Sequence, residues 1–285
     1  MYGNLIQAKK VMKIKLLILA NNFEASKKGL EDYFDEVDKK SLADVLVDTD
    51  GNVLIDGEEI TEWDSVYIDS EPKAFNYLRV LLETLEHKDI QCNLESTSIA
   101  VQGKKPFLFS VLSDKGVNIP DQVAISTEKG LTEIERELDF PLLAKKYSSF
   151  ELAESQIFEG FDDLKAFSEL SEHGNDFIMI QEYKEDDIFD ILYVDDSMIS
   201  LKLEASPWDK AESASVAKKY HSISGSQKKS VKKAVNSLGA NICRVRLCGD
   251  EVIDIDSRPD LVEFKEKSGK NVFGRVADAL KEDDN

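Results

Sequence analysis

Residues 252–259 read Val-Ile-Asp-Ile-Asp-Ser-Arg-Pro, an alternation of apolar and polar side chains that is typical of a β-strand ending near Pro259. Successive side chains of a strand point to opposite faces, so we expect Asp254 and Asp256 on one face, about 7 Å apart. Two such carboxylates repel each other unless a cation lies between them, and their oxygens suit Mg²⁺ bound to nucleotide phosphates. A solvent-facing acidic edge is the alternative, and the alternation alone does not separate the two.

Two earlier predicted strands also end in polar residues. The run Phe140-Pro-Leu-Leu-Ala-Lys145 ends in a lysine, and the run over residues 176–183 ends in Gln-Glu-Tyr. These three strand ends are the one constellation of chemical side chains that stands out in the sequence. The sequence contains no Gly-x-Gly-x-x-Gly turn, P-loop, His-Glu-x-x-His helix or Gly-x-Ser-x-Gly elbow. The three histidines lie far apart among polar neighbours, and we expect them at the surface.

Outward from these strands, hydrophobic periodicity predicts two kinds of unit. Up to residue 86 strands and helices alternate, which indicates an open α/β sheet. The predicted elements there are strands at 13–20 and 65–69, helices at 25–34 and 73–86, and a hairpin of 43–47 with 52–55. Beyond residue 104 the pattern is α+β, with helices at 107–115, 131–138, 161–170, 228–238 and 271–280, strands at 123–126, 141–145, 155–158, 176–183, 189–194 and 198–203, and a hairpin of 242–247 with 251–256.

Composition narrows the classes of partner. The chain has 285 residues, of which 42% are hydrophobic, as is typical of about two globular domains. With 56 acidic against 36 basic residues, its formal charge of −20 argues against nucleic-acid or membrane-surface partners. Three scattered cysteines give neither a disulfide framework nor a closed zinc site. We find no signal-peptide pattern and expect a cytoplasmic protein, with residues 1–12 as a disordered extension.

In the order of its segments the chain resembles the ATP-grasp superfamily, particularly the RimK-like ligases that join a carboxylate to an amine. Residues 98–105, a helix and Gly-Val-Asn-Ile-Pro at 116–120 look like the family's Lys, helix and G-I-P-x-P segment. Residues 140–145 are similar to its P-V-V-x-K strand, and Ile-Gln-Glu-Tyr at 180–183 matches its Q-E-Y/F hinge. Residues 190–196 and 252–271 resemble its D-I-R…V-x-G-D and V-x-E-V-N-x-x-P-G-L…G-x-N segments, so the likeness spans residues 13–280 in order.

This resemblance implies an ATP-grasp fold of the α/β (α+β) class. It would comprise an N-terminal open α/β domain (13–103), a lid subdomain (104–175) and a C-terminal subdomain (176–285), with the last two gripping a nucleotide. The implied cofactors are ATP and Mg²⁺, and the implied partners are an unidentified carboxylate and amine. The reaction would pass through an acyl phosphate that the amine captures. Homodimers are common in the family, so the resemblance also allows a dimer.

The resemblance also assigns roles residue by residue. Lys105 and Lys145 would hold the phosphates, and Asp254 and Asp256 the Mg²⁺ ion. The hinge would bind adenine, and a nearby acid the ribose; the residues are Gln181, Glu182 and Tyr183 for the hinge, and Asp187 or Asp190 for the acid. The candidate catalytic cations are Arg244, Arg246 and Arg258. Arginine is scarce in this chain, and the other arginines are at positions 79, 136 and 275.

The chain departs from the family pattern around the phosphates. Residues 146–154 contain no glycine where the family has a Gly-rich lid, and Glu151 and Glu154 would repel phosphate. The loop at 204–225 has no arginine, and leucine stands where an arginine is expected after Ile191. Near the expected upstream metal acid the sequence offers only Arg244 and Arg246. These either pair with phosphate in place of a metal's charge, or pair with Asp254 or Asp256 and quench the site.

Two functions follow from the matches and the departures. The retained lysine, hinge and acidic pair favour an active ATP-dependent carboxylate–amine ligase. The glycine-free lid and the missing arginines favour a degenerate ATP-grasp protein that serves as a non-catalytic nucleotide-binding or regulatory subunit. A third alternative is an acidic α/β protein whose likeness to the family arises by chance, and the sequence does not separate the three.

Overall fold

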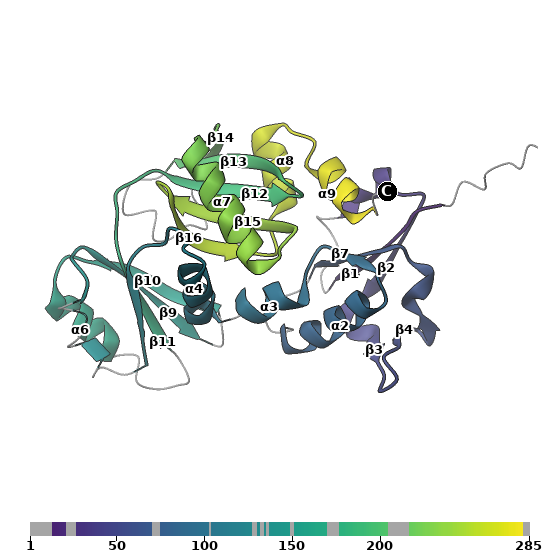
Figure 1. Ribbon diagram of the computed structural model, residues 1–285, viewed down its shortest axis with the longest axis horizontal. Coiled ribbons are helices and arrows are strands. Elements are labelled where there is room, and N and C mark those ends of the chain that lie inside the picture. The colour runs from purple at the N-terminus through teal and green to yellow at the C-terminus, as the bar shows by residue number, and fades with distance from the viewer. Residues whose placement is uncertain are drawn as a thin grey trace, which may run out of the picture.

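The computed structural model describes residues 13–20, 27–69, 75–102, 104–126, 130, 131, 134, 137–148, 151–169, 177–204 and 217–281. The predicted extension at 1–12 and residues 205–216 of the predicted substrate loop lie outside this set. The described residues form four sheets in an elongated molecule, with the N-terminal sheet at one end and the strands β9 to β11 at the other (Figure 1). None of the described helices has the length and apolar character needed to cross a bilayer.

The first sheet is parallel, with the strand order β2-β1-β6-β7. Its strands are β1 (Lys15–Ala20), β2 (Glu36–Ser41), β6 (Ser65–Asp69) and β7 (Gln91–Cys92). The strand β1 is covered on both faces, which explains its continuous apolar run. Leu17 and Leu19 pack in a core with the helix α2 (Phe75–His87), while Leu16 and Ile18 pack with C-terminal helices. The sequence pattern missed β2, because this edge strand is largely polar and only partly buried.

Short elements surround this sheet. They are α1 (Lys27–Leu30), 3₁₀ turns at Glu31–Tyr33, Leu42–Asp44 and Ile60–Glu62, and a small antiparallel sheet of β3 (Val45–Val47), β4 (Val53–Ile55) and β5 (Glu58–Glu59). The predicted hairpin at 43–55 is confirmed, and the Asp48 side chain accepts backbone N–H groups of Asp50 and Asn52 in its turn. The predicted helix at 25–34 is wrong in extent, because α1 ends at Leu30 and a 3₁₀ turn follows.

The second sheet is antiparallel, with the order β10-β9-β11-β8. Its strands are β8 (Gln122–Ile125), β9 (Leu142–Ser148), β10 (Glu151–Phe158) and β11 (Phe177–Glu182). One face packs apolar side chains against α6 (Phe161–Glu169), and the other carries Lys145, Tyr147 and Gln181. The stretch predicted as a glycine-free lid continues the β9–β10 ladder on both sides of residues 149 and 150, with an irregularity between Leu152 and Glu154.

The third sheet is antiparallel and holds five strands in the order β14-β13-β12-β15-β16. They are β12 (Ile188–Val194), β13 (Ser197–Glu204), β14 (Ala217–Tyr220), β15 (Ile242–Cys248) and β16 (Glu251–Asp256). The helix α7 (Gly225–Leu238) covers one face, together with α4 (Lys105–Asp114). Ser224 and Gln227 form a capping box at the start of α7, and Gly239 ends it in the left-handed conformation, so the predicted helix is confirmed and begins three residues earlier.

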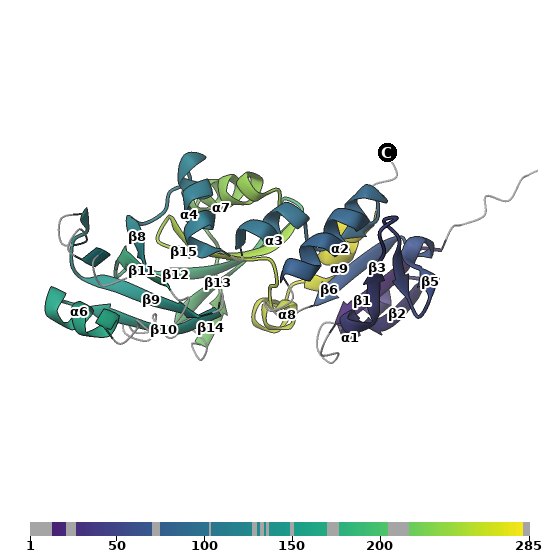
Figure 2. The same cartoon turned by 90° about the horizontal axis from the view of Figure 1, so that it is seen from below.

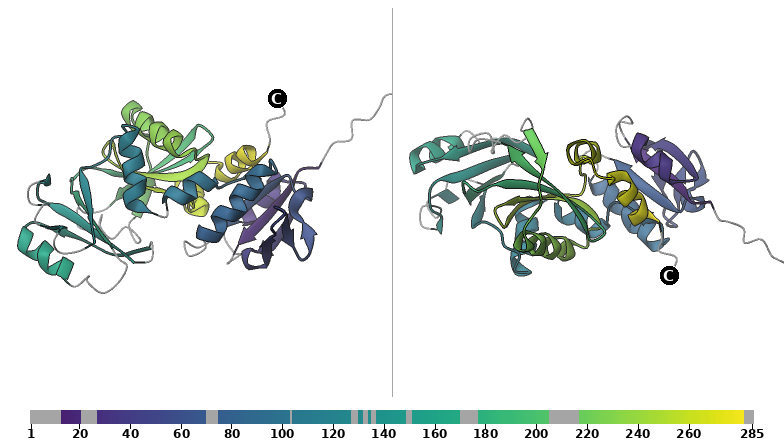
Figure 3. Two further views of the ribbon diagram at one scale, coloured as in Figure 1. Left: turned by 60° about the horizontal axis from the view of Figure 1, so that its bottom comes forward. Right: turned by 90° about the horizontal axis from the view of Figure 1, so that it is seen from above.

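The C-terminal helices join the third sheet to the first. They are α8 (Leu261–Ser268) and α9 (Val272–Leu280), while α3 (Ser96–Gln102) lies between α2 and α4 (Figures 2 and 3). One apolar cluster contains Leu16 and Ile18 of the first sheet, Leu192 of the third, and Phe264 and Phe273 of these helices. The domain limits predicted at 103/104 and 175/176 stay a prediction, and α9 packs both on α1 beside the first sheet and on β12 of the third.

The contact between α1 and α9 yields a stability prediction. A Cβ at Gly29 would overlap the ring of Phe273, whereas a Cβ at Gly225, the first residue of α7, would meet no atom within 4 Å. We expect Gly29→Ala to lower the free energy of unfolding by about 1–3 kcal/mol through overpacking, and Gly225→Ala to leave it nearly unchanged. Equilibrium urea unfolding measures both. Equal midpoints for Gly29→Ala and the wild type would show that α1 does not pack on Phe273 in this way.

Candidate functional site

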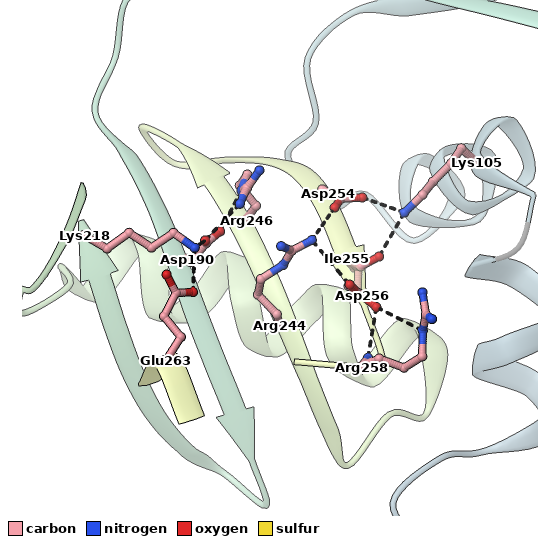
Figure 4. A network of polar contacts seen from close by, with 10 residues as sticks. All are labelled: Lys105, Asp190, Lys218, Arg244, Arg246, Asp254, Ile255, Asp256, Arg258 and Glu263. Carbon is pink, nitrogen blue, oxygen red and sulfur yellow. Dashed lines mark hydrogen bonds and ion pairs between the residues drawn. The ribbon is translucent and has the colours of Figure 1, made fainter. Parts of the chain in front are cut away.

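The face of the third sheet opposite α7 carries a row of charged side chains. Strand alternation sends Cys243, Val245 and Leu247 of β15 into the core beneath α7, so Arg244 and Arg246 point to the other face. In the ladder Arg244 lies directly across from Asp256, and Arg246 lies between Asp190 of β12 and Asp254 of β16. The sequence prediction that Asp254 and Asp256 share one face is confirmed (Figure 4).

Cations contact both aspartates of β16. The Nη2 atom of Arg244 lies 2.7 Å from Oδ2 of Asp254 and 3.7 Å from Oδ2 of Asp256. The Nζ atom of Lys105, in the first turn of α4, donates to Oδ1 of Asp254 at 2.6 Å and to the carbonyl oxygen of Ile255 at 3.1 Å. Burial alone would raise the pKa of Asp254, but the charges of Lys105 and Arg244 hold it well below its usual range. Asp254 is therefore ionised and paired.

Arg258 closes the row at Asp256. Its backbone N–H donates to Oδ1 of Asp256 at 2.9 Å, and its Nε lies 3.8 Å from the same oxygen. Arg258 also lines a cavity of about 260 Å³ with Tyr67, Asp69 and Leu261, between the carboxyl end of β6 and the start of α8. This arginine therefore stands where the first sheet meets the third.

At the other end of the row, Asp190 is fully buried and doubly paired. Nε and Nη2 of Arg246 donate to its two carboxylate oxygens at 2.6 and 2.9 Å, and Nζ of Lys218 lies 2.9 Å from Oδ2. Lys218 also pairs with Glu263 of α8 at 2.7 Å. Burial would raise the pKa of Asp190, but the bonds and charge of Arg246, helped by Arg244 and Lys218, lower it to about 2.

This pairing bears on the two acids assigned to the ribose, and both assignments stay predictions. Both oxygens of Asp190 accept from cations and are buried, so a ribose hydroxyl would have to compete with Arg246 and Lys218 for them. Asp187 is largely exposed and pairs with Lys202 at 2.6 Å, so its assignment to ribose stays a prediction.

The second sheet contributes a lysine of a different kind. Nζ of Lys145 donates to the side-chain oxygen of Gln181 at 3.0 Å, and no carboxylate in the described part of the chain lies within ion-pair distance of it. Burial is the main reason that the pKa of Lys145 falls to about 8; the negative charge of Asp254 opposes this shift, and the positive charges of Lys105 and Arg246 add to it. An added negative charge nearby would therefore stabilise the ammonium form.

The predicted hinge follows β11. The backbone N–H of Glu182 donates to the carbonyl oxygen of Asp121 at 3.1 Å, and that of Tyr183 donates to Pro141 at 2.9 Å. The side chain of Gln181 is buried and turned toward Lys145. The segment is thus held firmly against β8 and β9, and its role as an adenine hinge stays a prediction.

Taken together, these side chains form a basic cluster in an acidic protein. Lys145 and the residues joined by these ion pairs make six cations (Lys105, Lys145, Lys218, Arg244, Arg246 and Arg258) and four carboxylates (Asp190, Asp254, Asp256 and Glu263), an excess of two positive charges within this set; Asp69 and Asp260, which line the cavity beside Arg258, are not counted in it. The whole chain carries a formal charge of −20. An excess of cations in partly dehydrated surroundings favours an anionic ligand.

The same residues do not fit a bound Mg²⁺ ion as they stand. Each of the four oxygens of Asp254 and Asp256 faces a cation, from Lys105, Arg244 or Arg258. Nowhere in the described ranges do three His, Cys, Asp or Glu side chains gather as a metal site requires. The sequence left Arg244 two roles, pairing with phosphate or pairing with the aspartates. In this structure it pairs with both aspartates.

Solved structures share this whole architecture. The ATP-grasp ligase PsnB complexed with a minimal precursor superimposes with a TM-score of 0.74 at 16% identity, over 94% of this chain and 98% of that one. The chain has the ATP-grasp fold. A D-alanine–D-alanine ligase from Bacillus anthracis complexed with ATP gives 0.67 at 15% identity, covering 94% and 96%. A RimK domain ATP-grasp protein from Sphaerobacter thermophilus gives 0.70 at 13%, covering 93% and 98%.

The predicted fold and its RimK-like resemblance are thereby confirmed. No family model matches the sequence, and no curated protein matches it. At these identities the shared feature is the backbone arrangement, which includes the sheet of β8–β11 and the sheet of β12–β16.

Sequence reasoning did not assign two members of the cluster. Lys218 was one of four lysines in a long loop, and its pairing depends on β14, which residues 205–216 separate from β13. Glu263 reaches Lys218 from the first turn of α8, a helix that the hydrophobic pattern did not predict. Neither residue carries a local signal, because the contact is made between strands and helices distant in sequence.

The Asp190 cluster predicts a pH-dependent stability. The folded-state pKa of about 2 lies below the ordinary aspartate value of 3.8, so this carboxylate stabilises the fold above about pH 4, and the contribution is lost as pH falls toward 2. Its size is about 2 kcal/mol. Asp190→Asn should lower stability at pH 7 and flatten the acid limb of stability against pH, as measured by urea unfolding from pH 7 to pH 3. An unchanged acid limb would show that Asp190 is not held ionised by Arg246.

Proposed function

We propose that the protein binds ATP in a cleft between these two sheets and acts as an ATP-dependent ligase that joins a carboxylate to an amine. The observation that carries the proposal is the position of Lys145. It is a partly buried cation with no carboxylate partner among the described residues, close enough to Lys105 and Arg246 for their charges to lower its pKa. A group of cations held together against their own repulsion is a site for a polyanion such as a triphosphate.

The roles follow from which sheet carries each side chain. Lys145 and Gln181 project from the second sheet, while Lys105 and Arg244 stand on the side of the third. A triphosphate between the sheets would meet cations from both, with the segment around Tyr183 beside the base. Catalysis of phosphoryl transfer rests mainly on positioning and charge neutralisation, which this arrangement supplies through side chains.

The proposed reaction has two steps. A carboxylate oxygen of the substrate attacks the γ-phosphorus, which forms an acyl phosphate and releases ADP. The nitrogen of an amine then attacks the acyl carbon, phosphate leaves, and the amide forms with loss of a proton. The solved neighbours support this class: one is a D-alanine–D-alanine ligase with ATP, and another is PsnB with precursor peptide PsnA2 and AMPPNP. The cavity lined by Tyr67, Asp69 and Arg258 is our candidate for the carboxylate or amine substrate.

A second candidate function is nucleotide binding without turnover. The observation that favours it is the set of ion pairs on Asp254 and Asp256, which removes both carboxylates from metal coordination. The stretch between β9 and β10 also offers no glycine to wrap the phosphates. Under this function the protein would act as a regulatory or interaction subunit that reports nucleotide occupancy.

The role of Lys145 predicts a loss of affinity. Lys145→Met should weaken ATP binding about 10- to 100-fold, the equivalent of one charge-assisted hydrogen bond of about 1.5–3 kcal/mol, as measured by isothermal titration calorimetry. Lys219→Met removes the same charge from an exposed lysine of β14 paired with Glu204, and should leave affinity unchanged. Wild-type affinity should also fall as pH rises through about 8, where the Lys145 ammonium is lost. A Lys145 variant that binds as well as the wild type would refute the assigned site.

Turnover separates the two candidate functions. Wild-type protein that binds ATP is incubated with ATP and a mixture of amino acids and short peptides, and ADP is measured against a protein-free control. The ligase function predicts ADP release that depends on the mixture and disappears in Arg258→Met, because Arg258 lines the candidate substrate cavity. Binding of ATP without ADP release under any substrate mixture would instead support the non-catalytic function.

A further inference from the structure

We propose that this cleft takes its nucleotide free of divalent metal, with the guanidinium of Arg244 supplying the positive charge that a Mg²⁺ ion would otherwise bring. The inference rests on the proposed nucleotide site and specifies the form of nucleotide that the site selects. It follows from the chemistry around Asp254 and Asp256, the two carboxylates that the sequence pattern assigned to a metal.

The carboxylate oxygens are the first argument. Oδ1 of Asp254 accepts from Lys105 at 2.6 Å, and Oδ2 accepts from Arg244 at 2.7 Å. Oδ1 of Asp256 accepts the backbone N–H of Arg258 at 2.9 Å, and Oδ2 faces Arg244 at 3.7 Å. Mg²⁺ requires near-octahedral oxygen coordination at about 2.1 Å and keeps several waters. To bind here it would have to displace two or three cations that already neutralise these oxygens.

The position of Arg244 is the second argument. It sits in the middle of β15, directly across the ladder from Asp256, so its backbone is fixed by pairing on both sides. Only about a fifth of its side chain is exposed. Its guanidinium reaches both aspartates from this rigid place, as a metal ion between them would. An arginine held in a regular strand is pre-organised, so little ordering entropy remains to be lost when a ligand arrives.

The same guanidinium also carries an unsatisfied hydrogen-bond donor, which is the third argument. The Nε–H of Arg244 is buried and has no hydrogen-bond acceptor in the described structure. A buried donor without a partner costs about 1–3 kcal/mol. A phosphate oxygen that draws the guanidinium toward itself would relieve that cost, whereas a metal ion would only repel the guanidinium. The unsatisfied atom therefore favours an anion at this position.

The charge of the cluster is the fourth argument. Its six cations exceed its four carboxylates by two, so it attracts the free nucleotide more strongly than the metal complex, whose charge Mg²⁺ has already reduced by two. Lys145, whose side chain meets no carboxylate in the described ranges, adds to this preference. Mg²⁺ then acts as a competitor for the phosphates, and excess Mg²⁺ should weaken binding.

Calorimetric titration with ATP tests the inference in two media, one containing EDTA and one containing excess MgCl₂. Wild-type affinity should be at least as high in EDTA as in MgCl₂. In Arg244→Glu the affinity in EDTA should fall at least about tenfold, and Mg²⁺ should restore it, because the new carboxylate completes a set of three acids with Asp254 and Asp256. The control is Arg79→Glu, the same charge change at an exposed residue of α2 paired with Glu83, which should behave as wild type.

The outcomes are distinguishable from failure of the proposed function. ATP binding by the wild type only in MgCl₂, or at least tenfold tighter there, would overturn the inference and leave the nucleotide site standing. No binding in either medium would refute the nucleotide site itself. If circular dichroism shows that Arg244→Glu does not fold, the wild-type protein alone tests the inference. Its titration with Mn²⁺ in the absence of nucleotide, followed by electron paramagnetic resonance, should show only free ion. Bound Mn²⁺ in the absence of nucleotide would overturn the inference.

Discussion

The contact of Arg244 with Asp254 and Asp256 is the interaction on which the site depends. Two ionised carboxylates two residues apart on one face of a strand repel each other where they are partly buried, and a cation has to lie between them. Here the cation is covalently part of the chain and comes from the adjacent strand. Because Lys105 and Arg258 then complete the pairing, α4, β15, β16 and the start of α8 are held in one electrostatic arrangement.

The fold could be predicted from sequence because the burial of its strands sets the pattern of their apolar residues. The run at 15–20, covered on both faces, and the alternation at 251–256, covered on one, are direct consequences of where the sheet meets a helix layer. The turns at Asp48–Gly51 and at Gly249 also carry local signals. The strand β2 carried none, since a polar, partly exposed edge strand looks like a loop in a single sequence. The helix α3 is only seven residues long and buries Ser96, Ser98 and Ile99, so it shows no amphipathic period.

The site was accessible only in outline. Strand alternation placed Asp254 and Asp256 on one face, and the order of segments brought Lys105 and Lys145 to the same region. The sequence did not show that Arg246 would pair with Asp190 and not with Asp254, which is equally adjacent in the ladder. It also did not show that Lys218 and Glu263 would join this pair. Those choices depend on side-chain reach across three strands and a helix, and ion pairs between residues 28 to 56 positions apart leave no periodic trace.

The packing of α9 on the first sheet has a consequence for the order in which the protein is made. One face of β1, with Leu16 and Ile18, packs in a cluster with residues of α8 and α9, which are synthesised long after β1. N-terminal units commonly fold first during synthesis, but this face of the sheet stays uncovered until those helices have been made. The formal charge of −20 carried by the chain opposes association between copies while that apolar face is exposed.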